Sequence, residues 1–594
     1  MKQFLFVACV CIVSLFLTNC HNKYAKISDS SKKEVARSRF AKNYPDFVPQ
    51  KLTDMLQEQV GKDSLLLRLY ADNEFAAIWV NDTFSTKKID NLVAILNKSS
   101  NNGLFPSFFH TKRIISLKDS INSGLYANKT EALYAAILEM EFTATKAVIT
   151  YVSGMNYGFT TPQKVYPTDC DIAVMTPDST FYKTIRKKII DDPIALMLQS
   201  QPSNPMYQRL LSVFQNLEHK KDITLNQIPN NVTYKLGDTS RYIADIARRI
   251  ALTEDYQIDT LMPDSLTASL LKAVNTFRKA NSLPESNEIG KTTLDALNRP
   301  IAYYEKKLQA NLERYRWKRL QPQLDKHIEV NIASAMLVAT QPDSLPLKMR
   351  VCTGDVKHKS PLLQSTISYI NLNPVWHVPV SIVQKEIVIS QKNDNTYLKR
   401  HHMKLYRGNR EIDPSSVNWK KIDPTKFSYT IRQDAGDNNS LGLIKFMFKN
   451  DFAVYLHDTP SKGAFYNQNR AVSHGCIRLQ NPFDLAFFCV SPATDLYKDR
   501  ILHSVKKSPL STTGKKALAD STLKKLPDII SPKNKISLAI DYYTVFTYPG
   551  DETLYYTDDV YGYDDLILNA LNPVHNEEAH TAQYAAARTT HASF

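Results

Sequence analysis

Hydrophobic residues recur at three- and four-residue spacing over much of the first 240 positions. The clearest case is the segment 130–148 (TEALYAAILEMEFTATKAV), and 92–96 is a shorter one. This spacing puts apolar side chains on one side of a helix, so it predicts helices. Asn101-Asn102-Gly103 provides a turn between two of them. We therefore expect a helical scaffold domain over residues 45–239.

The pattern changes near residue 325 to short runs of β-branched and aromatic residues broken by Pro, Asp and Gly. These runs predict strands and include HIEVNIASAMLVAT, LPLKMRVCTGD, STISYINLNPVWHVPV and FAVYLHDTP. A polar insertion rich in Tyr, Lys, Asn and Asp follows at about 390–440. Long insertions beside a site often act as lids. The sequence therefore predicts a mostly β domain over 300–508 with a lid-like insertion.

Three further segments complete the organisation. Residues 240–299 place Leu266, Leu270, Leu271, Val274 and Phe277 on one helical face. Residues 509–575 combine a Lys-rich helical stretch with the β-like run ISLAIDYYTVFTY, and we expect them to pack on the scaffold or on the β domain. The last residues, 576–594, read as a flexible tail. The fold class expected is a multidomain α+β protein.

The N-terminus carries a targeting signal. Lys2 precedes an apolar run of about 14 residues, 4–17, which is too short to span a bilayer but fits the core of a signal peptide. Leu17-Thr18-Asn19-Cys20 resembles a bacterial lipobox, in which Cys20 receives a lipid, although Asn19 departs from the usual small residue. We expect a signal peptide over 1–20, a polar tether over 21–44 and a periplasmic protein anchored to a membrane through Cys20. Plain cleavage without lipidation is the alternative.

Composition limits the class of protein. The chain has 594 residues, which is too many for one hydrophobic core, and its 43% hydrophobic and 22% charged content is typical of globular proteins. The net charge of +15 is dispersed along the chain and suits an anionic partner. No motif for nucleic-acid binding is present, so we expect no such partner. The cysteines after Cys20, which are Cys170, Cys352, Cys476 and Cys489, are too few for a disulfide scaffold.

Cys476 is the candidate nucleophile. It follows Ser473-His474-Gly475, and His457 lies upstream with sixteen residues between the two histidines. A thiol needs a base or a cation to become a thiolate at neutral pH, and a histidine supplies the base. Gly475 leaves room for a substrate carbonyl and lets backbone N–H groups converge on a developing oxyanion.

Three other interpretations of these residues remain open at this stage. A buried structural cysteine is the commonest fate of a lone Cys. Zinc is a second, since His457, His474 and Cys476 are possible ligands, but no recognisable further ligand completes a site and we expect no metal. A papain-like protease is a third, but its histidine lies far downstream of the cysteine.

The spacing of His457 and Ser473-His474-Gly475-Cys476 resembles the motif of the L,D-transpeptidase family. The similarity extends to the large periplasmic branch of that family, through segments that include Asn311–Trp317, Asn373–Pro379, Asn439-Ser440-Leu441-Gly442 with Lys445-Phe446, and Tyr455–Pro460. It covers most of residues 45–575, although the N-terminal part matches only loosely. Residues 240–299 resemble a small three-helix peptidoglycan-binding module, through Ala273, Val274, Phe277, Leu283, Gly290, Thr293, Leu297 and Asn298.

The family resemblance implies a role for each residue. Cys476 is the nucleophile and His457 is the base, oriented by a backbone carbonyl. Backbone N–H groups around His474, Gly475 and Cys476 form the oxyanion hole, and Ser473 and the His474 ring are structural. Substrate binding falls to Arg478, Trp376 and Tyr455. Many members have Asn where this chain has Arg478, which either pairs with a substrate carboxylate or braces the loop.

The resemblance also implies the reaction. A tetrapeptide stem donor acylates the cysteine, and a diaminopimelate-type amine resolves the thioester to a 3–3 cross-link, without a cofactor. Water as the acceptor would make the protein an L,D-carboxypeptidase, and a protein amine would make it a protein-to-peptidoglycan ligase. A wall-binding lipoprotein without activity is the non-enzymatic alternative. Carbapenem-type inhibitors are expected to acylate an active site of this kind.

Overall fold

The computed structural model describes residues 39–80, 86–220, 223–253, 264–320 and 322–572. The expected signal peptide, the Cys20 anchor, most of the tether and the tail lie outside these ranges. The chain divides into two compact units, which are described separately below. One comprises residues up to 90 together with 113–144, and the other comprises 91–112 and everything from 145 onward. The boundaries fall within helices α4, α5 and α6, so the predicted 45–239 segment contributes to both units.

The first unit is helical, as the apolar spacing predicts. Its buried side chains include Leu56, Leu69 and Leu133. Glu141 is also fully buried, and its carboxylate accepts hydrogen bonds from the backbone N–H groups of Ile78 and Trp79. The helices that lie wholly or partly in this unit are α1 (Arg39–Asn43), α2 (Pro49–Gln59), α3 (Ser64–Asp72), α4 (Lys87–Asn97), α5 (Thr111–Ser123) and α6 (Thr130–Tyr157).

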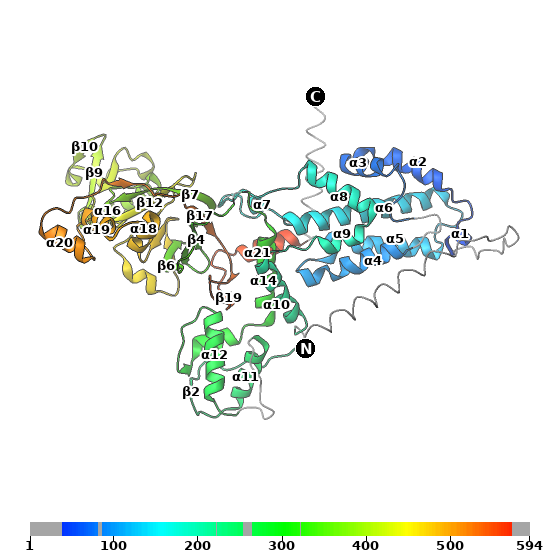
Figure 1. The fold of residues 1–594 in the computed structure, drawn as a ribbon, viewed down its shortest axis with the longest axis horizontal. Coiled ribbons are helices and arrows are strands. Elements are labelled where there is room, and N and C mark those ends of the chain that lie inside the picture. Colours follow the sequence, from blue (N-terminus) through cyan, green and yellow to red (C-terminus); the bar gives the residue numbers. More distant parts are fainter. Residues whose placement is uncertain (1–38, 81–85, 221–222, 254–263, 321, 573–594) are drawn as a thin grey trace, which may run out of the picture. The chain divides into compact units, whose positions relative to one another are not determined.

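The second unit also contains many helices. Several begin at a side chain that caps the first turn, as Asp178 and Asn204 do. Helix α14 contacts both α10 and α21 (Figure 1). The helices here are α7 (Pro162–Val165), α8 (Ser179–Asp191), α9 (Pro193–Gln199), α10 (Pro205–Glu218), α11 (Arg241–Thr253), α12 (Ala268–Ala280), α13 (Lys291–Leu297), α14 (Ile301–Arg316), α18 (Pro482–Val490), α19 (Asp495–Ser504), α20 (Thr512–Ala519) and α21 (Tyr563–Leu571).

Within the expected 240–299 module, three helices, α11, α12 and α13, share one apolar core. Leu270, Val274 and Phe277 of α12 are buried in it, as their helical spacing predicts. A short two-stranded ladder joins β2 (Tyr234–Lys235) to β3 (Glu288–Ile289) beside them. The segment thus contains three helices and one short ladder, and residues of α10 and α14 share its apolar core.

The β domain is a sheet whose pairings close into a ring. The order is β7, β12, β13, β15, β6, β5, β4 and β17, and β17 pairs back with β7. Alternate residues are buried along β12 and β5, as expected for strands with one face on a core. The strands are β4 (His327–Asn331), β5 (Met336–Thr340), β6 (Leu347–Gly354), β7 (Leu362–Leu372), β12 (Ile444–Phe448), β13 (Leu456–His457), β15 (Ile477–Leu479) and β17 (Ser537–Asp541).

Short strands are added to this sheet. A separate two-stranded ladder comes later in the sequence. β1 (Cys170–Asp171) and β16 (Ile529–Ile530) pair with β7, and β14 (Ala471–Ser473) pairs with β6. The pair β18 (Val545–Phe546) and β19 (Tyr555–Tyr556) comes after β17. The expected C-terminal segment thus supplies β17 to the sheet of the β domain itself. Its Lys-rich helical stretch is the short helix α20, Thr512–Ala519.

The polar insertion is a folded subdomain with its own sheet, in the order β10, β9, β11 and β8. It begins near Trp376, before the expected bound of 390. Val388, Leu398, Leu405 and Ile431 are buried in its separate apolar core. Its elements are β8 (Trp376–His377), α15 (Val380–Ile382), a π-helical turn (Val383–Ile387), α16 (Val388–Asn393), α17 (Tyr397–Arg400), β9 (Met403–Arg407), β10 (Arg410–Ile412) and β11 (Thr430–Gln433).

Candidate active site

The candidate nucleophile and base lie on two neighbouring strands. His457 ends β13, and Cys476 directly precedes β15, which runs parallel to β13 with His457 opposite Arg478. The ladder continues to Tyr455, whose carbonyl accepts a hydrogen bond of 3.1 Å from the Ile477 N–H. Because alternate residues of paired strands point to the same side, the side chains of Tyr455, His457, Cys476 and Arg478 share one face of the sheet.

The backbone of Asp458 fixes the imidazole of His457. Its carbonyl oxygen lies 2.5 Å from Nδ1 of His457, and a carbonyl can only accept, so Nδ1 donates and Nε2 is left as the basic nitrogen. Burial, together with the charges of Arg478 and Lys445, lowers the pKa of His457 to about 3. The base is therefore neutral in the free protein. The backbone carbonyl that the family resemblance implies is present at this position.

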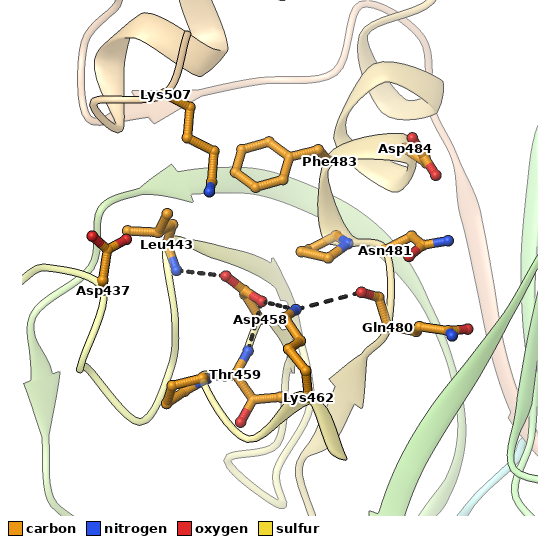
Figure 2. Close-up of a pocket in the computed structure, with 12 residues that line it drawn as sticks. Asp437, Leu443, Asp458, Thr459, Lys462, Gln480, Asn481, Phe483, Asp484 and Lys507 are labelled. Carbon is orange, nitrogen blue, oxygen red and sulfur yellow. Dashed lines mark hydrogen bonds and ion pairs between the residues drawn. The ribbon is translucent and has the colours of Figure 1, made fainter. Parts of the chain in front are cut away.

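The Asp458 side chain holds this backbone in place (Figure 2). Its carboxylate accepts hydrogen bonds from the N–H groups of Leu443 (2.9 Å) and Thr459 (2.7 Å) and pairs with Nζ of Lys462 at 2.6 Å. Gly442 has φ +60°, and a Cβ there would lie 2.4 Å from the Asp458 carboxylate. A side chain at position 442 would therefore displace the group that positions the base.

A cavity of about 430 Å³ opens beside Asp458, between the 458–462 turn and the start of α18. Figure 2 shows Lys462, Gln480, Phe483 and Lys507 around it. Neither Cys476 nor His457 is among its lining residues. The cavity therefore lies beside Asp458, which positions His457, and not at the Cys476 thiol or the His457 ring.

Tyr455 connects the nucleophile to the insertion. Its pKa responds to the Cys476 thiol and to the Trp376 side chain, both of which lie near its hydroxyl. Burial raises the pKa of the Cys476 thiol, while hydrogen bonds from Tyr455 and the charge of Lys445 oppose this shift. The structure thus brings the predicted substrate-binding residues Tyr455 and Trp376 next to Cys476, which is a thiol at neutral pH in the free protein.

The turn before Cys476 is fixed by its own hydrogen bonds. The Ser473 hydroxyl donates to the Cys476 carbonyl (2.5 Å) and accepts from the Gly475 N–H (3.2 Å). Gly475 has φ +105°, a conformation that favours glycine. Of the three N–H groups expected in the oxyanion hole, that of Gly475 is thus engaged within the turn. The described residues provide no partner for those of His474 and Cys476.

His474 contacts the insertion. Its Nε2 lies 2.5 Å from a carboxylate oxygen of Glu386, and its ring centroid is 5.0 Å from that of His358. The structural role that the family resemblance gives to the His474 ring stays a prediction. Because Glu386 belongs to the π-helical turn Val383–Ile387, the pair ties the insertion to the nucleophile turn.

Three supporting residues were missed by the sequence argument. Ser360 donates from its hydroxyl to the Gly475 carbonyl (2.7 Å), and the Tyr561 hydroxyl accepts from the Ser360 N–H (3.1 Å). Lys445 lies opposite His457 on β12, with its Nζ 3.8 Å from the centroid of the Tyr455 ring. Only Lys445 occurs in a segment that resembles the family, and nothing in that segment marks its role.

Among the described ranges, no group of three or more His, Cys, Asp or Glu side chains is arranged to hold a metal ion. Cys170, Cys352, Cys476 and Cys489 are free thiols. Within the same ranges, no helix has both the length and the apolar content that a membrane crossing requires.

Two family models match the chain. Residues 325–495 match the L,D-transpeptidase catalytic domain, and residues 64–213 match a scaffold domain. A curated protein of Haemophilus influenzae, named "Putative L,D-transpeptidase", is 33% identical over 246 residues, which cover 39% of this chain and 49% of that protein. The chain thus spans about half the length of this relative. The match to the L,D-transpeptidase catalytic domain includes His457 and Cys476 and falls within the β domain.

Two solved structures show a weaker likeness. An L,D-transpeptidase from Xylanimonas cellulosilytica is 13% identical, with a TM-score of 0.15 over 44% of this chain and 90% of that one. An L,D-transpeptidase from Stackebrandtia nassauensis is also 13% identical, with a TM-score of 0.19 over 45% of this chain and 91% of that one. At these scores neither likeness adds weight to the family match.

Proposed function

We propose that the protein is an L,D-transpeptidase that forms 3–3 cross-links between peptidoglycan stem peptides through a Cys476 thioester. The observation that carries the proposal is the pairing of β13 with β15. It puts Cys476 on the same face as His457, whose Nδ1 is held by the Asp458 carbonyl. A fixed tautomer leaves Nε2 free to take and return a proton, which is what acyl transfer from a cysteine requires.

In the first half-reaction, the Cys476 sulfur bonds to the carbonyl carbon of the third stem residue. The amide bond to the fourth residue breaks, and its amine leaves with the proton that His457 took from the thiol. In the second, an acceptor amine attacks the thioester and loses a proton to His457, the Cys476 thiolate leaves, and His457 returns that proton to the sulfur. The N–H groups of His474 and Cys476 are the donors for the oxyanion in both steps.

The decisive experiment is mass spectrometry of muropeptides from cells that express the protein. Wild type is expected to produce 3–3 cross-linked dimers, and Cys476→Ala and His457→Ala are each expected to abolish them. Cys170→Ala is the matched control, because it removes a partly buried free thiol far from the motif in sequence. Retained 3–3 dimers in Cys476→Ala would refute the proposal. Tripeptide products alone would indicate an L,D-carboxypeptidase, and stem peptides joined to a protein would indicate a ligase.

Covalent labelling by a carbapenem tests the active site separately from the acceptor. We expect one adduct on the purified protein, located at Cys476 and missing in Cys476→Ala. A protein that binds the wall without catalysis would give no adduct, which separates the enzyme from the inactive alternative.

We infer, from the N-terminal sequence, that the protein is periplasmic and held to a membrane through a lipid on Cys20. Metabolic labelling with a palmitate analogue is expected to mark wild type and to fail in Cys20→Ala. An unlabelled wild-type product would contradict the anchor and leave a cleaved periplasmic protein.

A further inference from the structure

Two positively charged side chains flank the base. Lys445 of β12 lies opposite His457 of β13, and His457 lies opposite Arg478 of β15. Directly opposed residues of neighbouring strands point to the same side of a sheet. Lys445, His457 and Arg478 therefore form one row across three strands, on the face that also carries Cys476.

Neither cation has an anionic partner in the part of the chain that the structure describes. Lys445 contacts the ring of Tyr455 at 3.8 Å, and burial lowers the pKa of its ammonium group. Arg478 is partly buried on β15. The nearby carboxylate of Asp458 is engaged with Lys462 at 2.6 Å. Keeping partly buried charges unpaired costs free energy, which an arriving anion can recover.

We propose that Lys445 and Arg478 together bind a carboxylate of the peptide that acylates Cys476, and so select donors with a free carboxylate beside the scissile amide. This rests on the proposed function and names the chemistry that the site recognises. An ammonium and a guanidinium on either side of the base present several N–H donors to one carboxylate. The carboxylate comes either from the end of the donor peptide or from the side chain of the acylating residue.

The row has a consequence for the base. The charges of Arg478 and Lys445 both act against protonation of His457, whereas the backbone and charge of Asp458 favour it. A carboxylate bound between the two cations offsets their repulsion, so Nε2 of His457 accepts the thiol proton more readily. Binding of the correct donor therefore makes His457 a stronger base towards the thiol.

Alkylation of Cys476 by a charged and a neutral reagent tests the cations without a turnover assay. Rates of iodoacetate and iodoacetamide with the full-length protein are compared, and the Cys476 peptide is quantified by mass spectrometry. In wild type, the iodoacetate to iodoacetamide ratio is expected to exceed that of Lys445→Gln or Arg478→Gln by about five- to tenfold, because each change removes one nearby charge. Lys445→Arg is expected to keep most of the preference.

Lys449→Gln is the matched control. Lys449 is exposed directly after β12, so its loss removes the same charge from the same segment and is expected to leave the ratio unchanged. An equal ratio in wild type, Lys445→Gln and Arg478→Gln would overturn the proposal. If neither reagent modifies Cys476 in wild type, the proposed nucleophile itself is wrong, which is a different failure.

Donor peptides identify the source of the carboxylate. Two tetrapeptides are compared, one amidated at its C-terminus and the other amidated at the side-chain carboxyl of its third residue. We expect one amidation to lower kcat/KM in wild type by about tenfold, and to have little further effect in Lys445→Gln. If both amidated peptides react as well as the parent peptide, no carboxylate is recognised and the proposal fails.

Discussion

At the scale of single residues, the reactivity of Cys476 depends on a balance of opposing effects. Burial raises the pKa of its thiol, whereas interactions with Tyr455 and the charge of Lys445 lower it. A raised pKa leaves less thiolate at neutral pH, so each opposing contact increases the reactive fraction. Tyr455 is the contact that can be removed with the least change in shape.

Tyr455→Phe is therefore expected to slow alkylation of Cys476 by iodoacetamide about tenfold at pH 7, since a hydrogen bond to a charged group is lost. The rate should recover as the pH rises, because the thiol still ionises. The measurement is the pH dependence of the rate in both proteins. Tyr466→Phe is the control, since Tyr466 is 74% exposed. Superimposable profiles for wild type and Tyr455→Phe would contradict the role given to Tyr455.

The sequence could indicate the candidate reacting groups but not all of the residues that support them. Cys476 and His457 are recognisable because their spacing and their neighbours form a motif within about twenty positions. Ser360 and Tyr561 act on the same turn through partners 115 and 201 positions apart in the chain. No local pattern of apolar and polar residues reports such pairings, because they depend on how the strands are ordered.

At the scale of elements, one side chain connects the two ends of the insertion. Asn439 is buried, and its amide nitrogen donates to the carbonyls of Pro374 (3.1 Å), Gln433 (3.1 Å) and Asp434 (2.9 Å). Its side-chain oxygen accepts from the Leu441 N–H at 2.8 Å. These contacts join the two ends of the segment 376–433, which carries Trp376 and Glu386 to the candidate active site.

Asn439→Ala is expected to loosen the insertion, with a loss of about 2–4 kcal/mol of local stability from several hydrogen bonds. Hydrogen exchange measured by mass spectrometry should become faster across 376–433 and stay unchanged in the module 240–299. The neighbouring Asn438, which is exposed, gives the control Asn438→Ala. Unaltered exchange in Asn439→Ala would show that other contacts hold the insertion.

The insertion also shows why element bounds were harder to predict than element types. Its composition separated it from the surrounding strands, but its first strand, β8, has only two residues and no alternation to detect. The residues from Val380 onward form helical turns within what the sequence marked as β domain. A subdomain with its own core, not a bare loop, forms the region predicted as a lid.

At the scale of the whole chain, the catalytic domain is larger than the family match. The match ends at residue 495, but β17 lies between β4 and β7 and closes the ring of strands. The parallel pairing of β17 with β4 joins Ser537 to His327. Such a pairing is invisible to hydrophobic periodicity, which explains why residues 509–575 were predicted only to pack on other domains.

The C-terminal segment also contacts the support of the nucleophile turn. The Tyr561 hydroxyl donates to the Gly354 carbonyl at 2.6 Å and accepts from the Ser360 N–H at 3.1 Å. Ser360 in turn donates to the Gly475 carbonyl. A residue 85 positions beyond Cys476 thus lies two hydrogen bonds away from the turn that carries it.

Tyr561→Phe tests whether this connection positions the nucleophile. The ring and its packing remain, but two buried backbone groups lose their partner, at a cost of about 2–4 kcal/mol. We expect faster hydrogen exchange at 473–476 and slower carbapenem acylation of Cys476. Hydrogen exchange in the strands of the closed sheet is expected to stay unchanged. Tyr369→Phe, on strand β7 where no hydrogen bond to the hydroxyl is present in the described structure, is the control. If Tyr561→Phe matches this control in exchange and acylation, the C-terminal segment closes the sheet without tuning the active site.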